Sequence, residues 1–455
     1  MLAPRSITET TLLNSLISKG FMPYFSKLND KLHAKLNTKK HVKCSELSDN
    51  ACQVQHSNYL LFLMALVFSK IADALTSAKV VLPWMMASTG APVFLTSLLV
   101  PIRESGSMLP QIMLGAYIRR FPTRKHFLIY GALLQSAIVI ALLCVALNFS
   151  GISAGIAIVL LTVVFSLSRA ISSIANKDVL GKTIDKSKRG TLLGTAASIA
   201  GLASIVLAVF LYFRDSELGG VDVLLGFAAC CFLLSAVSFG AIKEFAGSID
   251  KQSDTKSVLK SNLHLLKSDP QFLRFVMVRS LMISSGLAAP YFVLMAQTNQ
   301  TSSHVSLAGL ILLGGIASFI SGRIWGKLAD KNSKFLITFT ALINSVICAV
   351  AATLMWLNEN HSLYYLVLFF TLLVVHEGVR QGRKTYLVDM AQGNKRTDYV
   401  ALSNSLIGVV LLVIGLVSGM IAQFSLVAVM ALFTVFSCLA FVLSFTLQNV
   451  SKSRD

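Results

Sequence analysis

The sequence predicts an all-α membrane protein in which twelve transmembrane helices form two six-helix repeats. Of the 455 residues, 55% are apolar and only 13% are charged, and the apolar residues gather in long runs. Soluble globular proteins carry about 25% charged residues, so an ordinary soluble enzyme is excluded. A third observation is that Lys and Arg gather in the short breaks between the apolar runs.

Twelve apolar runs approach or exceed the length that a membrane-spanning helix needs, which is about 20 residues. The runs lack the period-2 alternation of an outer-membrane barrel strand. In chain order, the expected spans are 59–85, 92–115, 127–148, 154–175, 191–213, 222–242, 271–297, 305–326, 335–357, 363–382, 400–422 and 424–447.

The basic residues predict the orientation of these spans. If both termini are cytoplasmic, 32 of the 40 Lys and Arg residues fall in inside segments, and Arg214 alone falls in an outside loop. Cytoplasmic loops of membrane proteins carry this excess of bases. The net charge of +19 therefore indicates a lipid bilayer rather than nucleic acid as the partner, because nucleic-acid binders place their bases on a solvated face.

Residues 1–58 form a basic cytoplasmic extension. Phe25, Leu28, Leu32 and Leu36 recur at helical spacing, which predicts an amphipathic helix on the anionic inner leaflet. A loosely ordered, solvated tail is the equal alternative. The rest of the chain divides into an N-terminal half, a cytoplasmic linker, a C-terminal half and a cytoplasmic tail, at 59–242, 243–270, 271–447 and 448–455.

The two halves repeat each other at a constant offset. Pro83 and Pro290 are 207 residues apart, and the same offset joins Gly201 to Gly408. It also places His376 where the first half has Arg169. In transporters built from repeats, the substrate site lies near the bilayer midplane where the repeats meet.

A glycine-led basic segment follows both the second and the eighth span. The second copy reads Gly326-Lys-Leu-Ala-Asp330-Lys331-Asn-Ser-Lys334, and the first reads Gly115-Ala-Tyr-Ile-Arg119-Arg120-Phe-Pro122-Thr-Arg124-Lys125. The second copy resembles the loop motif of the major facilitator superfamily, Gly-x-Leu-Ala-Asp-Arg-x-Gly-Arg-Arg. The first keeps the glycine and the bases but has Arg119 where the family has Asp. With the twelve spans, the resemblance covers roughly 59–447 and implies the fold of that family.

The resemblance also implies that this loop motif stabilises one conformation of two rocking halves. Glycine lets two helices approach closely, and the aspartate can pair with bases or cap a neighbouring helix. Because Arg119 replaces the acid, the first copy cannot act through that carboxylate. The expected gating residues are Gly115, Arg119, Arg120, Arg124, Gly326, Asp330 and Lys331.

Ionisable residues within the spans are the candidate functional residues, because a charge at the bilayer centre costs at least about 2.5–3.5 kcal/mol. The proton-coupling candidates are Asp73, Glu377 and Glu104. The substrate-binding candidates are Lys70, Arg103, Arg169, Arg279 and His376. A structural charge network, in which Lys70 pairs with Asp73 and Arg103 with Glu104, is the alternative. The bases expected only to extend toward an interface are Lys79, Arg274 and Arg323.

Two of the arginines suggest the charge of the substrate. Arg169 and Arg279 have no acid within one turn on their own helices, so we expect both to be free. The planar fork of arginine suits a carboxylate or a phosphate. An organic anion or a zwitterion is therefore the expected substrate.

The function expected from the sequence is secondary active transport of a small solute by alternating access, coupled to protons. The chain has no Walker-type glycine loop, which argues against ATP as the energy source. No cofactor, no metal and no disulfide are expected, nor is a catalytic activity. We expect a monomer in the bacterial inner membrane, with substrate, protons and lipid as its partners.

Three other functions remain open from the sequence. One is a drug or metabolite efflux antiporter of the same fold, and another is a transporter-like sensor that binds a ligand without moving it. A membrane-embedded enzyme is the third, although the sequence shows no cluster of His, Asp and Ser at one interface. Flux of a labelled solute in proteoliposomes separates transport from sensing.

The distribution of bases generates a topology prediction. Reporter fusions after residues 250 and 455 should give cytoplasmic signals, and a fusion after residue 150 should give an external one. Reporters active on only one side of the membrane measure this directly. An external signal at residue 250 or 455 would contradict the topology.

Overall fold

The computed structural model describes residues 47–118, 120–212, 220–246, 268–298, 306–359, 361–390 and 395–450, which contain helices and no strands. The amphipathic helix expected in the 1–58 extension lies outside the described residues, as does most of the 243–270 linker. The helices are α3 (Asp49–Gln53), α4 (Gln55–Leu75), α5 (Val81–Ser88), α6 (Val93–Ser97), α7 (Leu99–Met108), α8 (Gln111–Ile118), α9 (Lys125–Asn148), α10 (Gly151–Thr183), α11 (Lys186–Tyr212), α12 (Val221–Ala241), α14 (Pro270–Leu281), α15 (Ser284–Thr298), α16 (Leu307–Lys331), α17 (Ser333–Trp356), α18 (Ser362–Met390), α19 (Lys395–Ala422) and α20 (Leu426–Ser444).

Eleven helical segments in the described part of the chain are long and apolar enough to cross a membrane. They correspond to all the expected spans except the second, at 92–115. Large apolar side chains such as Leu160, Phe210 and Val442 are exposed on the outside of the bundle. An apolar exterior is what contact with lipid requires. The twelve-helix count and the cytoplasmic termini stay predictions.

Prolines explain why the second span is missing from that count. The segment forms three short helices, α6, α7 and α8, of which the longest has 10 residues. Pro92 is the N-cap of α6, Pro101 is the third residue of α7, and Pro110 directly precedes α8. Proline fits the first turn of a helix but interrupts a longer one, because it lacks an N–H group and clashes with the preceding turn.

The first and seventh spans are broken at corresponding places. The first becomes α4 and α5, which are separated by residues 76–80, and the seventh becomes α14 and α15. Pro83 and Pro290 follow these breaks, as the repeat offset requires. Broken helices at membrane depth are tolerated where other parts of the protein satisfy the freed backbone groups.

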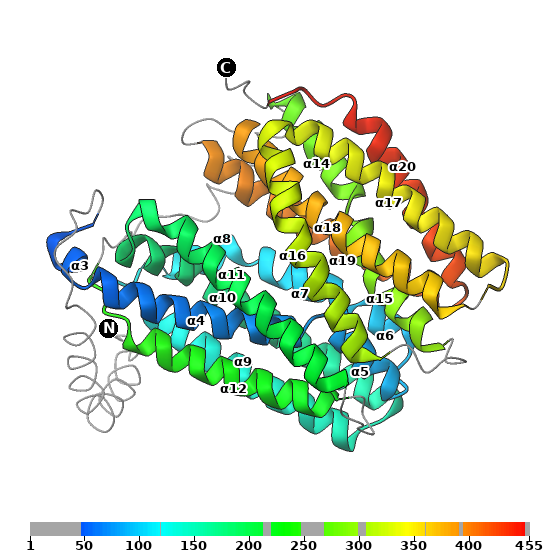
Figure 1. The fold of residues 1–455 in the computed structure, drawn as a ribbon. Coiled ribbons are helices and arrows are strands. Elements are labelled where there is room, and N and C mark those ends of the chain that lie inside the picture. Colours follow the sequence, from blue (N-terminus) through cyan, green and yellow to red (C-terminus); the bar gives the residue numbers. More distant parts are fainter. Residues whose placement is uncertain are drawn as a thin grey trace, which may run out of the picture.

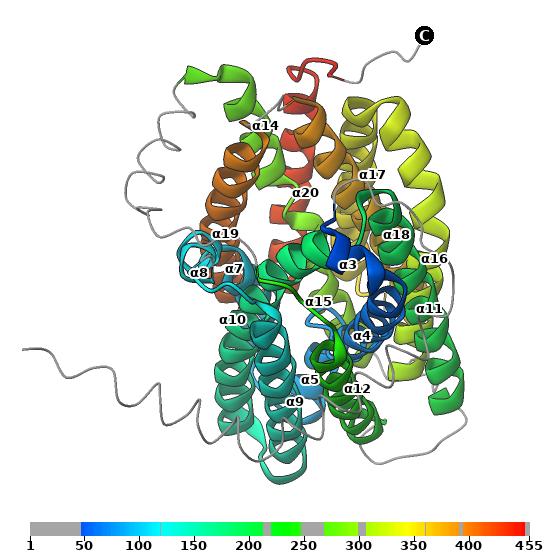
Figure 2. The ribbon, with the colours of Figure 1, turned by 90° about the vertical axis from the view of Figure 1, so that its left-hand side faces the viewer.

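The helices form two groups, α4–α12 and α14–α20 (Figure 1). The most extensive contacts in the first group join α9 to α12, and those in the second join α17 to α20. These pairs are the third and sixth expected spans of each half, so the two groups pack in the same way. The two groups diverge toward α8 and α14 (Figures 1 and 2), and they contact each other most extensively through α11 with α16 and through α7 with α19.

Small residues allow the two groups to approach closely between α19 and the α6–α7 segment. A Cβ atom added at Gly419 would lie 2.1 Å from Ser97 Oγ, and one added at Gly415 would lie 2.1 Å from Pro101 Cγ. One turn further along α7, the Ser105 hydroxyl donates to the carbonyl oxygen of Gly408 at 2.8 Å. We call this contact the glycine interface.

One expectation about the cysteines is wrong. Cys52, at the end of α3, is disulfide-bonded, although no disulfide was expected. The expectation rested on the absence of cysteines from the predicted outside loops. Five cysteines in the spans are free, namely Cys144, Cys230, Cys231, Cys348 and Cys438.

The glycine interface generates a prediction about conformation. Gly415→Leu should force α7 and α19 apart, since overpacking costs about 1–3 kcal/mol. With the native cysteines replaced, a Ser105→Cys probe should then react several-fold faster with a membrane-impermeant maleimide added outside. Gly194→Leu is the matched control, because a Cβ at Gly194 meets nothing within 4 Å. An unchanged labelling rate in Gly415→Leu would mean that Gly415 does not keep α7 and α19 in close contact.

Candidate functional site

Asp73, near the end of α4, binds two arginines from two other helices. Arg103 on α7 approaches Asp73 Oδ1 with its Nη2 atom at 3.3 Å, and Arg169 on α10 binds the same oxygen through Nη1. All three side chains belong to the N-terminal group of helices. The carboxylate therefore joins α4, α7 and α10 at the depth of the expected site.

The break after α4 gives Arg103 a second partner. Helix α4 ends at Leu75, and the carbonyl oxygen of Thr76 accepts a hydrogen bond from Arg103 Nη1. The guanidinium group also lies over the ring of Phe165, 4.5 Å from its centroid. The buried Arg103 is thus held by a carboxylate, a freed backbone carbonyl and an aromatic face, which together offset its burial.

Lys79 and His376 form a polar contact between the two groups of helices. Lys79 lies in the break between α4 and α5, and its Nζ atom is 2.6 Å from Nε2 of His376 on α18. The other ring nitrogen of His376 is 3.0 Å from Ser285 Oγ on α15. The expectation that Lys79 extends to the outer interface is therefore wrong: the helix break turns its side chain toward α18.

Glu377 and Arg380 pair on α18, where Nη1 of Arg380 is 2.8 Å from Oε1 of Glu377. Arg383 lies within electrostatic range of both, and of Glu104 on α7. The tenth expected span, 363–382, ends before Arg383, whereas α18 continues to Met390. The i, i+3 spacing of Glu377, Arg380 and Arg383, which places them on one helix face, was the available signal.

Arg279 on α14 is buried and has neutral partners. It donates from Nη1 to Ser403 Oγ at 2.5 Å and from Nη2 to the side-chain oxygen of Asn404 at 2.9 Å. Arg383 is the charged group within its electrostatic range. Arg279 was expected to be free, and its described hydrogen-bond partners are these two neutral side chains. Arg169 was also expected to be free, and it instead pairs with Asp73 from another helix.

These side chains are linked into one group, which we call the central charge cluster. Lys70 belongs to it, because it lies within electrostatic range of Asp73, Arg169 and Arg380. Glu104 lies within range of bases from both groups of helices, including Lys79 and Arg380. The cluster comprises Lys70, Asp73, Lys79, Arg103, Glu104, Arg169, Arg279, His376, Glu377, Arg380 and Arg383.

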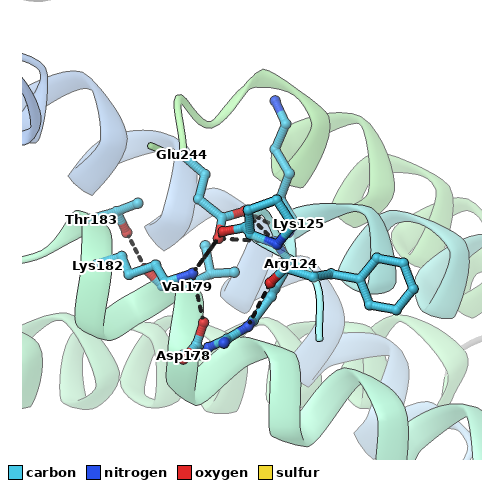
Figure 3. A network of polar contacts seen from close by, with 9 residues as sticks. Arg124, Lys125, Asp178, Val179, Lys182, Thr183 and Glu244 are labelled. Carbon is cyan, nitrogen blue, oxygen red and sulfur yellow. Dashed lines mark hydrogen bonds and ion pairs between the residues drawn. The ribbon is translucent and has the colours of Figure 1, made fainter. Parts of the chain in front are cut away.

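A second polar network lies at the far end of the N-terminal group and includes the predicted gating residue Arg124 (Figure 3). Arg124 pairs with Asp178 on α10, and Lys182 Nζ lies 3.1 Å from the other oxygen of Asp178. Lys182 also lies 3.2 Å from Oε1 of Glu244, which follows α12. Lys125 completes this Glu244 network.

Glu244 caps the start of α9. Its carboxylate accepts from the backbone N–H of Arg124 at 2.8 Å and from that of Lys125 at 2.7 Å. The Lys125 ammonium in turn donates to the carbonyl oxygens of Gly240 and Ile242, at the end of α12. An anion at a helix N-terminus and a cation at a helix C-terminus both interact favourably with the helix dipole.

The remaining gating residues have no described role. Arg119 and the side chain of Asp330 lie outside the described residues. Gly115 is buried in α8, and Arg120 and Lys331 are exposed. A Cβ at Gly326 would meet nothing within 4 Å. Their part in gating stays a prediction.

A tyrosine connects the start of the C-terminal group to α19. Asp269 caps α14 by accepting from the backbone N–H groups of Gln271 and Phe272, and its second oxygen accepts from the Tyr399 hydroxyl at 2.6 Å. Burial and the adjacent Asp269 carboxylate raise the pKa of Tyr399 to about 12. The hydroxyl therefore stays protonated as a donor at neutral pH.

The chain is similar in sequence to a known protein family and to several bacterial proteins. The sequence model of the Major Facilitator Superfamily matches residues 61–382. Uncharacterised proteins of Mycobacterium bovis and Mycobacterium tuberculosis are each 22% identical over 360 residues, which is 77% of this chain and 69% of theirs.

Solved transporter structures share the fold. A D-xylose–proton symporter has a TM-score of 0.62 at 14% identity, and the match covers 86% of this chain and 96% of that one. The nucleoside transporter NupG has a TM-score of 0.63 at 11% identity, and the match covers 86% of this chain and 98% of that one. Likeness at these identities concerns the fold alone.

The Glu244 network generates a prediction about stability. Glu244→Gln should destabilise the N-terminal group by about 1.5–3 kcal/mol, because the neutral amide has only one oxygen to accept the hydrogen bonds that the carboxylate accepts with two. The melting temperature of the purified protein should fall. Glu359→Gln, an exposed acid outside the network, is the matched control. Equal melting temperatures for the two variants would mean that Glu244 does not stabilise this end of the bundle.

Proposed function

Because the chain belongs to the Major Facilitator Superfamily, we propose that it is a proton-coupled secondary transporter that carries a small organic anion or zwitterion by alternating access. The family match and the apolar helices make the chain an integral membrane transporter and not an enzyme. The observation that supports the proton coupling and the charge of the substrate is the position of Asp73, which is bound by two arginines from two other helices.

The proposed coupling is a competition for Arg169. In the described conformation the Asp73 carboxylate holds Arg169 and Arg103. An anionic substrate that binds Arg169 releases Asp73 from that partner. A carboxylate that loses one of its two cations binds a proton more readily, because less positive charge then stabilises its ionised form. Substrate anion and proton are then bound together and are carried in the same direction.

Release follows by the reverse exchange. On the other side of the membrane, the proton leaves Asp73 and the restored carboxylate attracts Arg169 again. The same guanidinium group cannot fully bind both partners, so the returning carboxylate weakens substrate binding. This exchange needs no group other than substrate and proton.

The other candidate residues surround the pair of Asp73 and Arg169 in the proposed mechanism. We propose that Lys70, Arg103, Arg279 and His376 complete the binding site, and that Glu377 and Glu104 are the alternative proton carriers. Glu377 is paired with Arg380, so it too would bind a proton only after losing a cation. The two copies of the loop motif, from Gly115 and from Gly326, are the proposed gating elements.

The proposed setting is the bacterial inner membrane, which is consistent with the mycobacterial relatives. We propose that the protein acts as a monomer with both termini in the cytoplasm. In that orientation, the glycine interface closes the outer side in the described conformation. Transport then requires this interface to separate while the opposite ends of the two groups meet.

Asp73→Asn tests the coupling. Proteoliposomes with an inward proton gradient are screened with a panel of labelled organic acids. For any acid that the unaltered protein accumulates, Asp73→Asn should reduce gradient-driven accumulation at least tenfold and leave counterflow exchange measurable. The amide keeps the shape of the side chain but cannot bind and release a proton.

Asp49→Asn is the matched control, because Asp49 is exposed in α3 and should leave accumulation unchanged. Undiminished accumulation in Asp73→Asn would remove Asp73 from the coupling and transfer the role to Glu377 or Glu104. Exchange and accumulation lost together, in a variant that still folds, would indicate a purely structural ion pair.

A further inference from the structure

The central charge cluster carries more positive than negative charge. It contains three carboxylates among the described residues, Asp73, Glu104 and Glu377. Apart from the exposed Lys384, which also lies within electrostatic range, its seven fixed bases are Lys70, Lys79, Arg103, Arg169, Arg279, Arg380 and Arg383. With His376 neutral, the excess is four positive charges.

Two of the three carboxylates already form ion pairs. Asp73 binds Arg103 and Arg169, and Glu377 binds Arg380. Glu104 lies among bases from both groups of helices. Each acid therefore offsets the charge of bases that are already close to it, and the excess of four positive charges remains.

Two of the remaining bases have only neutral hydrogen-bond partners in the described structure. Lys79 contacts the ring of His376 at 2.6 Å, and Arg279 donates to Ser403 and Asn404. Nε of Arg279 is buried and has no hydrogen-bond partner among the described residues, and neutral partners leave both positive charges uncompensated.

From this imbalance we infer that the substrate is an organic compound with at least two negative charges, such as a dicarboxylate or a phosphate ester. The inference rests on the proposed function and narrows the substrate class of the same site. A single negative charge would offset only one of the four excess positive charges. A dianion offsets two and can contact bases of both groups of helices.

The position of the bases favours a ligand that contacts both groups of helices. Lys70 lies on α4 and Lys79 just after it, whereas Arg279 and Arg383 lie on α14 and α18. Arg279 and Arg383 lie within electrostatic range of each other, so the C-terminal side alone brings together two positive charges. A guanidinium fork binds carboxylate and phosphate oxygens in pairs. One anionic group of the substrate would occupy this side while the other binds Arg169.

Ligand binding to the full-length protein tests this inference. The purified chain is placed in nanodiscs of phosphatidylcholine, which has no net charge, at pH 8 and fixed ionic strength. Calorimetry then compares succinate and glycerol 3-phosphate, which carry two charges, with propionate and lactate, which carry one. We expect at least one dianion to bind tenfold or more tightly than both monoanions.

Variants at Arg383 test whether the central charge cluster causes the preference for dianions over monoanions. Arg383→Gln should reduce the ratio of dianion to monoanion affinity about tenfold, and Arg383→Lys should retain most of it because the charge remains. Arg274→Gln is the matched control, since Arg274 is exposed on α14 and should leave the ratio unchanged. The lysine variant also shows whether a loss in the glutamine variant reflects charge or folding.

The outcomes separate this inference from the proposed function. Equal affinities for dianions and monoanions, including no binding of either, would overturn the inference even if an anion is transported. An unchanged ratio in Arg383→Gln would overturn it as well. A dianion preference that Arg383→Gln removes, in a protein that shows neither flux nor exchange, would support the inference about the ligand while the proposed transport fails.

Discussion

The pairing of Asp73 with Arg103 and Arg169 is the interaction on which the candidate site depends. A buried charge at membrane depth needs a partner, and here one carboxylate oxygen serves two guanidinium groups from α7 and α10. The three helices are thereby fixed relative to one another at the depth where the two groups of helices meet. A ligand that competes for either arginine therefore breaks a bond between α4 and one of the other two helices.

Interruptions in the helices make this arrangement possible. An unbroken first span would engage the Thr76 carbonyl in its own helix and carry Lys79 toward the membrane surface. The break after α4 instead presents that carbonyl to Arg103 and directs Lys79 to His376. Prolines that reduce helix stability thus supply both a backbone acceptor and a contact between the halves.

The sequence was sufficient for features that depend on composition and local spacing. The apolar runs predicted eleven of the helices found, and the membrane-depth charges predicted most members of the central charge cluster. It was insufficient wherever a partner comes from another helix. No residue near Arg169 in the sequence indicates that its partner is Asp73, which is 96 residues away. The basic residues Arg380 and Arg383 are typical of a cytoplasmic loop, so the sequence did not indicate that α18 continues to Met390.

Glu244 has a further consequence for how the chain is built. The residue that ends the N-terminal group binds the start of α9, and the end of the C-terminal group is bound in a similar way, because Lys334 donates to the carbonyl oxygen of Phe445. Each half is therefore fastened by bonds within itself. Such a half has the internal bonding of an independent polypeptide, as expected of a unit that was once duplicated and fused, and the two halves expressed as separate chains would retain those bonds.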